Sequence, residues 1–230
     1  MRTVELILED GKDYGTLEAF NTLRTNILFS GRDIKTILVT SCVAGEGKST
    51  VAFETAVSLA RIGKKVLLID GDLRKSAYAS RYTREKGLTG LSQYLSGQLD
   101  LDSVLYATQL PTLNTIFAGP FPPNPTELVG SAVFGELVQA EREHYDYILI
   151  DTPPLGLVID AAVMAPACDG ALLVVGEGTV SYHMAQRVIG QLRKSGCRIL
   201  GAVLNQTRRR KVSKSKYYAS YYGKYTEKSK

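Results

Sequence analysis

Apolar positions along the chain form short runs that alternate with stretches of helical periodicity. The strand-like runs cover residues 36–41, 65–70, 113–118, 145–150, 170–175 and 198–204. Apolar residues recur with helical spacing at residues 49–62, 88–97, 126–144 and 181–195. This alternation predicts an α/β fold, with a mainly parallel sheet and helices on both of its faces. The proline-rich loop 119–125 precedes one predicted helix, which Asn124 or Thr126 could cap.

The segment 41–50, Ser-Cys-Val-Ala-Gly-Glu-Gly-Lys-Ser-Thr, lies between the first strand-like run and the first helix. Its glycines allow successive backbone N–H groups to turn toward phosphate oxygens. Lys48 supplies a cation for the phosphates, and Ser49 supplies a hydroxyl for Mg²⁺. The strict motif begins with glycine, whereas this chain has Cys42 at that position. The segment predicts a nucleotide site, and an ordinary strand-to-helix turn is the alternative.

Carboxylates follow two of the predicted strands. Asp70 and Asp72 end the second run, and Asp151 ends the run at 145–150. Because ligands collect at the carboxyl ends of parallel strands, we expect all three acids to face the crevice that holds the phosphate loop. Three acids beside a polyphosphate would form a Mg²⁺ site. The alternative for each aspartate is that it caps the following helix.

The composition is typical of a compact enzyme from a reducing compartment. The chain has 230 residues, of which 44% are hydrophobic and 22% charged, and this suits a single domain with a full core. We find no apolar run of eighteen residues and no signal peptide, so we expect a protein that is neither secreted nor membrane-spanning by itself. The three cysteines, Cys42, Cys168 and Cys197, are too widely spaced for a CxxC motif.

Positive charge is concentrated at the end of the chain. Residues 208–230 hold nine Lys or Arg and one Glu, a balance of +8, so an overall charge of +5 leaves −3 for residues 1–207. We therefore divide the chain into a domain, 1–207, and a flexible, basic, tyrosine-rich tail, 208–230. The tail carries five tyrosines, Tyr217, Tyr218, Tyr221, Tyr222 and Tyr225. From composition alone, it could also dock on anionic lipid or nucleic acid.

These motifs, taken in order, resemble those of bacterial tyrosine kinases of the capsule and exopolysaccharide type. The resemblance rests on the loop 44–50, the acidic segments 68–74 and 148–154, the segment 123–128 and the terminal tyrosine cluster. It covers essentially the whole chain. Its most specific element is the Asp-x-Asp segment combined with a tyrosine-rich tail.

The resemblance implies a P-loop fold and an ATP- and Mg²⁺-dependent protein-tyrosine kinase that regulates capsular or exopolysaccharide synthesis and export. The residues implied to bind ATP are Ala44, Gly45, Glu46, Gly47, Lys48, Ser49 and Thr50. Ser49, Asp72 and Asp151 would hold the metal, and Lys48, Asp70 and Asp72 would be catalytic. Asp70 is the expected base for the acceptor hydroxyl, with Asp72 as the alternative. The tail tyrosines would be the phosphorylation sites, including those of a neighbouring subunit.

Further expectations concern adenine recognition and assembly. Asn205 resembles a base-contacting asparagine of related ATPases, and a helix cap is the alternative for it. The resemblance implies a cytoplasmic kinase, held at the inner face of the plasma membrane by an activator's cytoplasmic tail, with other protein substrates as well. Relatives form homo-oligomeric rings through a helix with the pattern Glu-x-x-Arg-x-x-Arg. This chain has Glu18 and Arg24, with Asn21 in place of the first arginine, and a solvated helix face is the alternative.

Two rival functions share parts of this pattern. Partitioning and division-site ATPases, which are switches that bind DNA or membrane, carry similar aspartate segments. They usually have a lysine at the position of Val43 and lack a tyrosine cluster. A nucleic-acid binder would use the basic tail but would leave the three carboxylates without a role, so we expect no nucleic-acid partner. We expect the basic tail to be attracted to an acidic catalytic crevice, and its phosphorylation to loosen the ring.

Overall fold

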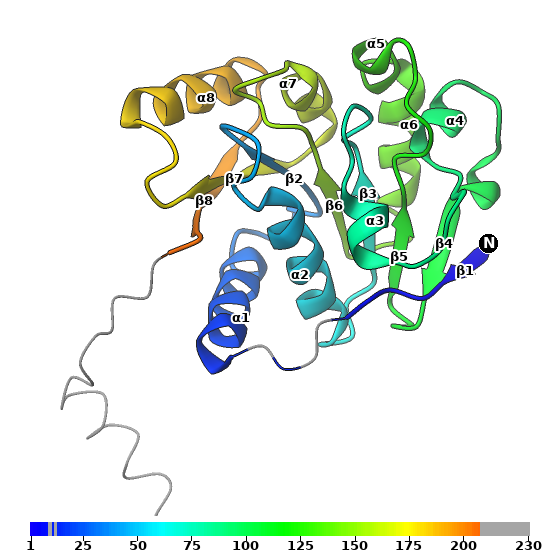
Figure 1. Cartoon of the computed structure of the whole chain (residues 1–230), viewed down its shortest axis with the longest axis horizontal. Helices are drawn as coiled ribbons and strands as arrows, with labels where there is room; N and C mark the ends of the chain where they lie inside the picture. Colours follow the sequence, from blue (N-terminus) through cyan, green and yellow to red (C-terminus); the bar gives the residue numbers. More distant parts are fainter. Residues whose placement is uncertain (9–10, 12, 208–230) are drawn as a thin grey trace, which may run out of the picture.

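A computed structural model describes residues 1–8, 11 and 13–207, and Figure 1 shows one sheet with helices on both faces. The strands are β1 (Arg2–Val4), β2 (Thr36–Ser41), β3 (Val66–Asp70), β4 (Leu105–Thr108), β5 (Leu113–Ile116), β6 (Tyr147–Asp151), β7 (Gly170–Gly176) and β8 (Ile199–Asn205). Their order across the sheet is β1-β4-β5-β3-β6-β2-β7-β8. Every neighbouring pair is parallel except β4 with β5, which confirms the mainly parallel sheet.

The helices form two groups that bury opposite faces of the sheet. The α-helices are α1 (Tyr14–Leu28), α2 (Lys48–Ala60), α3 (Tyr78–Tyr82), α4 (Leu91–Leu95), α5 (Pro125–Val129), α6 (Ala132–Glu141), α7 (Asp160–Met164) and α8 (Tyr182–Lys194). Helices α1, α2 and α3 contribute to one apolar layer, and α4 to α8 contribute to the other. Short 3₁₀ turns cover Leu101–Ser103 and Ala165–Ala167.

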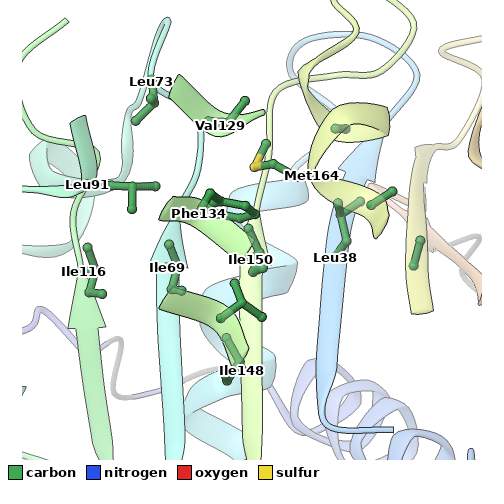
Figure 2. Packing of buried hydrophobic residues seen from close by; sticks show 14 of the residues in the cluster. Leu38, Ile69, Leu73, Leu91, Ile116, Val129, Phe134, Ile148, Ile150 and Met164 are labelled. Atoms are coloured by element: carbon green, nitrogen blue, oxygen red, sulfur yellow. The ribbon is translucent and has the colours of Figure 1, made fainter. Parts of the chain in front are cut away.

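The central strands are apolar because both of their faces are covered. Every residue of β2, β3 and β6 is buried, which explains their continuous rather than alternating apolar pattern. Figure 2 shows the layer under the second group of helices, where Ile69 and Ile150 of the central strands meet Phe134 of α6 and Met164 of α7. These strands form the rigid base of the site described below.

The predicted helix at 126–144 is wrong as a single element. The structure divides it into α5 and α6 at Gly130 and Ser131, where a poor helix former precedes a preferred N-cap residue. Asn124 stands at the N-cap of α5 but makes no side-chain cap bond, and its amide donates to Glu127. Thr126 does not cap α5 either, since its hydroxyl donates to Asp160. The predicted helix at 88–97 shortens to α4.

The predicted tail, 208–230, lies outside the described residues, so its boundary and flexibility stay predictions. The five tyrosines assigned as phosphorylation sites also lie there. Within the described part of the chain, no helix combines the length and the apolar character needed to cross a bilayer.

Candidate active site

The sheet places the predicted motifs side by side at one end. Strand β6 lies between β3 and β2, and its register pairs Asp151 with both Asp70 and Val39. The phosphate loop follows β2 directly, at Ser41. Because all three strands run parallel, their carboxyl ends lie at the same end of the sheet. The structure therefore brings the phosphate loop and the two aspartate-bearing strand ends together at one end of the sheet.

Backbone conformation and two side chains shape the phosphate loop. Gly45 and Gly47 have φ values of +86° and +85°, a region that glycine enters without steric cost. At the end of β8, Nδ2 of Asn205 donates to the carbonyl oxygen of Glu46 (2.9 Å), and Nε2 of Gln206 donates to that of Gly45 (2.7 Å). The β8 end thus binds loop carbonyls, and the loop leads into the N-terminus of α2, where free N–H groups favour anions.

Asn205 therefore has a structural contact that neither sequence interpretation anticipated. Its amide holds the loop backbone and lies close to Gly47, where a Cβ atom would come within 2.1 Å of Nδ2. A helix cap would instead accept a backbone N–H bond with its side-chain oxygen. Asn205 also lines the cavity described below, so a contact with the adenine base stays a prediction.

Lys48 lies among the three carboxylates. Its Nζ is 3.3 Å from Oδ1 of Asp151, 3.4 Å from Oδ2 of Asp72 and 3.2 Å from Oγ of Ser49. Burial alone would lower the pKa of Lys48, but the charges of Asp151, Asp72 and Asp70 more than offset this effect and raise it. Lys48 therefore stays protonated and compensates a buried acidic cluster.

Asp70 lies one layer below the cavity surface. It is 1% exposed, and its Oδ2 accepts a short hydrogen bond from the hydroxyl of Ser76, which itself lines the cavity. Burial, followed by the charge of Asp151, raises the pKa of Asp70 to about 7, although the Ser76 bond opposes the shift. Burial also raises the pKa of Asp151. Asp70 can therefore gain or lose a proton near neutral pH.

Asp72 closes a turn with one carboxylate oxygen and faces the site with the other. Its Oδ1 accepts the backbone N–H groups of Arg74 (3.3 Å) and Lys75 (3.0 Å), which closes the turn after β3. Its Oδ2 faces Lys48, and the residue lines the cavity. No helix of the described chain begins directly at Asp70, Asp72 or Asp151, so helix capping does not explain these acids.

The loop and the strand ends enclose a cavity of about 730 Å³. Gly45, Gly47, Lys48 and Ser49 form part of its wall. Other parts of the wall are basic, with Arg74, Lys75 and Arg81, or apolar, with Pro153, Pro154, Leu157 and Val158. Asp72 is the one acid among the described residues that line it. The prediction of an acidic crevice is therefore wrong, because Asp70 and Asp151 are buried and do not line the cavity.

Two residues assigned to ATP have side chains bound to the protein. The Glu46 side chain is buried and accepts protein hydrogen bonds on both oxygens. The Thr50 hydroxyl lies 2.9 Å from Nη1 of Arg81 and 3.3 Å from the hydroxyl of Tyr82. A nucleotide contact with Glu46 would therefore use its backbone N–H group rather than its carboxylate.

A network that the sequence did not predict connects the site to α5 and α7. Arg74 donates through Nε to Asp160 Oδ2 (2.7 Å) and through Nη2 to both Asp160 Oδ1 (3.1 Å) and the Thr126 hydroxyl (2.7 Å). Asp160 is buried, whereas the Arg74 side chain is 35% exposed at the cavity wall. Two features of the sequence could have suggested this network. Arg74 follows Asp72 by two residues, and Asp160 is a charged residue in an otherwise apolar stretch.

The helix assigned to ring assembly is present as α1. Glu18 is exposed, as expected for a contact or a solvated face. Arg24 is half-buried, and its Nη1 donates to the hydroxyl (3.0 Å) and the carbonyl oxygen (3.3 Å) of Ser58 on α2. The solvated-face alternative is therefore wrong for Arg24. Ring formation stays a prediction.

The residues at the site fit Mg²⁺ with part of its shell supplied by a nucleotide. Among the described residues, no group of three or more His, Cys, Asp or Glu side chains could hold a metal ion by itself. The expected site made of three acids is therefore not formed by protein groups alone. Mg²⁺ usually takes one or two carboxylates together with phosphate oxygens and water, and Ser49, Asp72 and Asp151 offer that kind of donor set.

Comparisons with known proteins agree with this geometry. A family model described as "ParA: NUBPL iron-transfer P-loop NTPase" matches residues 33–229. The tyrosine-protein kinase CpsD of Streptococcus agalactiae is 42% identical over 210 residues, which cover 91% of this chain and 90% of CpsD. The tyrosine-protein kinase YwqD of Bacillus subtilis is 37% identical and covers 90% of this chain and 86% of YwqD.

Solved structures separate the predicted family from its rival. A crystal structure of the chimerical protein CapA2B2 has a TM-score of 0.81 at 28% identity, covering 91% of this chain and 95% of its own. The kinase domain of the Escherichia coli tyrosine kinase ETK gives 0.80 at 32% identity, with 84% and 76% covered. The septum site-determining protein MinD of Pyrococcus horikoshii, complexed with Mg-ADP, gives 0.61 at 26% identity, with 74% and 70% covered. This chain belongs to the P-loop NTPases and, among them, to the bacterial tyrosine-protein kinases.

Proposed function

We propose that this kinase binds ATP with Mg²⁺ in the described cavity and transfers the γ-phosphoryl group to protein tyrosines. The observation that carries the proposal is the position of the Lys48 ammonium, between Asp72 and Asp151 and directly after the glycines of the loop. A cation beside acids, at a helix N-terminus, is the arrangement that polyphosphate with a divalent metal requires. The relatives named above support the acceptor as tyrosine.

Each residue then has a distinct part in the transfer. The loop N–H groups and Lys48 bind the phosphates and stabilise the charge that develops on the leaving oxygen. Ser49, Asp72 and Asp151 would hold Mg²⁺, which when bound neutralises charge on the β and γ phosphates. Once Lys48 binds phosphate, the carboxylates of Asp72 and Asp151 would no longer be paired with it and would be available as Mg²⁺ ligands.

The acceptor tyrosine must lose its proton, because its hydroxyl has a pKa near 10. We assign that proton to Asp70, which reaches the cavity through the hydroxyl of Ser76. Ser76 would accept the tyrosine proton as it donates its own to the Asp70 carboxylate. The tyrosine oxygen then forms the new bond to phosphorus while the bond to the ADP oxygen breaks.

We further propose that the acceptors include the tail tyrosines, Tyr217, Tyr218, Tyr221, Tyr222 and Tyr225. Their phosphorylation would regulate a head-to-tail ring and, through it, capsular or exopolysaccharide synthesis and export. The partner would be the cytoplasmic segment of a membrane activator, which would place this kinase at the inner face of the plasma membrane. The similarity to CpsD across nearly the whole of both chains supports this assignment.

The division-site ATPases remain the alternative class, and Val43 argues against them. Val43 packs against the apolar layer beneath α4 to α8, and its N–H group donates to Glu46. Valine carries no charge, so it cannot replace the lysine that those switches usually have at this position.

The test is to incubate the purified full chain with ATP and Mg²⁺ and to map phosphotyrosine by mass spectrometry. We expect phosphotyrosine in residues 208–230 of the wild type and none in Lys48→Met. ATP hydrolysis without phosphotyrosine, with the activator segment present, would contradict the proposal and favour a switch ATPase.

A further inference from the structure

The carboxylate of Glu46 connects the beginning of the phosphate loop to a distant turn. Its Oε2 accepts the N–H groups of Cys42 (2.7 Å) and Val43 (2.9 Å). Its Oε1 accepts the N–H group of Gly176 (3.0 Å) and the hydroxyl of Thr179 (2.6 Å). With 1% of the residue exposed, four donors satisfy a carboxylate that would otherwise be costly to bury.

Within the loop, this carboxylate acts as an internal anion. It binds the two N–H groups that open the loop and leaves those further along, toward the start of α2, for phosphate. The residue at the first motif position, Cys42, is completely buried in the apolar layer. Cys42 thus anchors its end of the loop through its side chain, while Glu46 fixes the backbone. A loop held in this way is ordered before a nucleotide arrives, which reduces the entropy lost on binding.

Thr179 lies outside the nucleotide cavity. It is exposed, it stands between β7 and α8, and it does not belong to the set of described residues that line the cavity. Its single hydroxyl hydrogen goes to the carboxylate, the stronger of its two neighbouring acceptors, while the carbonyl oxygen of Gly176 lies 2.8 Å away. A change at Thr179 can therefore reach the loop through Glu46 and by no direct contact with the nucleotide.

We propose that Glu46 is the positioning residue of the phosphate loop and that Thr179, outside the cavity, sets nucleotide affinity through it. The proposal extends the proposed function. It depends on that function only for the identity of the ligand, a nucleotide. The Glu46–Thr179 contact acts on binding rather than on phosphoryl transfer, because neither side chain reaches the reacting atoms. It also explains why this chain does not need glycine at position 42.

The decisive comparison is Thr179→Val against Thr179→Ser. Valine keeps the shape but removes the hydroxyl, whereas serine keeps the hydroxyl. Losing one hydrogen bond to a carboxylate should raise the Kd for Mg-ADP about three- to tenfold in Thr179→Val. Thr179→Ser should stay within about twofold of the wild type. In the kinase assay, Thr179→Val should raise the KM for ATP by the same factor while kcat at saturating ATP is kept.

A second readout follows the loop without nucleotide. Cys42 is buried, and burial raises the pKa of its thiol to about 11, so a maleimide should label it slowly. Labelling of Cys42, resolved from Cys168 and Cys197 by peptide mass spectrometry, should be faster in Thr179→Val and faster still in Glu46→Gln. In Glu46→Gln, an amide NH₂ group must face backbone N–H donors. If Glu46→Gln fails to fold, the Thr179 pair still decides the question.

The outcomes separate this proposal from the proposed function. Wild-type Kd and Cys42 labelling in Thr179→Val would overturn the role of Thr179 and Glu46. A fall in thermal stability without a change in Kd would also overturn it, since the contact would then be only structural. If the wild type itself binds no Mg-ADP, the proposed function fails, while unchanged labelling in Thr179→Val would independently refute the loop contact.

Discussion

Replacing Lys48 with methionine removes the cation that compensates the buried acids. Phosphotyrosine formation should fall by at least about a hundredfold, because a main stabiliser of the transferring charge is lost. The substitution should also destabilise the fold, since Asp72 and Asp151 lie within 3.4 Å and 3.3 Å of the missing ammonium. A purely functional role, with the fold left intact, would be the expectation from the sequence alone.

The magnitude follows from two competing costs. At 3.3 Å and an effective dielectric constant near 20, one Lys48–Asp151 charge interaction is about 5 kcal/mol. An orphaned aspartate can instead take up a proton, which costs about 4 kcal/mol at pH 7 and about 1.5 kcal/mol at pH 5. Protonation therefore limits the loss, and we expect the free energy of unfolding to fall by about 3–4 kcal/mol at pH 7.

Proton uptake by the unpaired aspartate also determines the sign of the pH dependence. In Lys48→Met, the pKa of Asp151 rises further above its unfolded value of about 3.8. A raised carboxyl pKa means that the native state binds a proton the unfolded state lacks, so stability increases as pH falls toward the unfolded pKa. The difference between variant and wild type should therefore shrink by about 2–3 kcal/mol from pH 7 to pH 5.

The assay is urea unfolding of nucleotide-free protein at pH 5, 6 and 7, followed by circular dichroism. Lys86→Met, at an exposed position, is the matched control and should stay within about 0.5 kcal/mol of the wild type. Lys48→Met combined with Asp151→Asn should regain stability but not activity. Equal stability of Lys48→Met and wild type at all three pH values would refute the argument that Lys48 compensates the acids.

Three further predictions test other parts of the molecule. Ser76→Ala and Asp70→Asn should each lower the initial rate of tyrosine phosphorylation at least about tenfold without recovery at higher Mg²⁺, whereas Asp151→Asn should recover in part. Full recovery of Asp70→Asn would reassign it as a metal ligand. Asp169 accepts the N–H groups of Lys35 and Thr36 and a bond from Arg142, which outweigh burial and lower its pKa. Asp169→Ala should lower the free energy of unfolding by about 2–3 kcal/mol at pH 7. A depressed pKa means that this contribution is present above about pH 4 and is lost as pH falls through the folded pKa, so an equal difference in urea unfolding at pH 7 and pH 3 would contradict the mechanism. Finally, changing the five tail tyrosines to Phe should prevent ATP from lowering the oligomer mass seen by light scattering with the activator segment, because each phosphotyrosine adds about −1.5 to −2 charges. Equal masses for both proteins before and after ATP would exclude the tail as the switch.

Sequence periodicity predicted the elements that carry the site because those elements are buried and long enough to show a pattern. Strands β2, β3 and β6 are fully buried runs with apolar centres, and β3 and β6 each end in an aspartate at the same end of the sheet. Strands β1 and β4, which the sequence did not predict, are short and only partly buried, so they carry no apolar run. The break between α5 and α6 lies at Gly130 and Ser131. The apolar spacing continues across these two residues, so the sequence predicted one long helix.

Side-chain direction in loops was the part that the sequence could not give. The loop motif named Glu46 as a nucleotide residue, but no period shows that its carboxylate turns inward toward Gly176, 130 positions away. The acids likewise suggested an acidic crevice, because three aspartates share one sheet edge. Their depth depends on the turn after β3, where Ser76 covers Asp70. Loop backbone and tertiary packing decide both features.

The end of β8 has a consequence for the kinetic order of the proposed tail phosphorylation. Gln206, two residues before the proposed tail, lines the cavity and donates to the carbonyl oxygen of Gly45. Tyr217 is eleven residues further along, a tether that spans at most about 36–40 Å. Short tethers give effective concentrations in the millimolar range, so the length of the chain permits transfer within one molecule. A preference for a neighbour's tail must therefore come from orientation, and it would make the initial rate per enzyme rise with enzyme concentration.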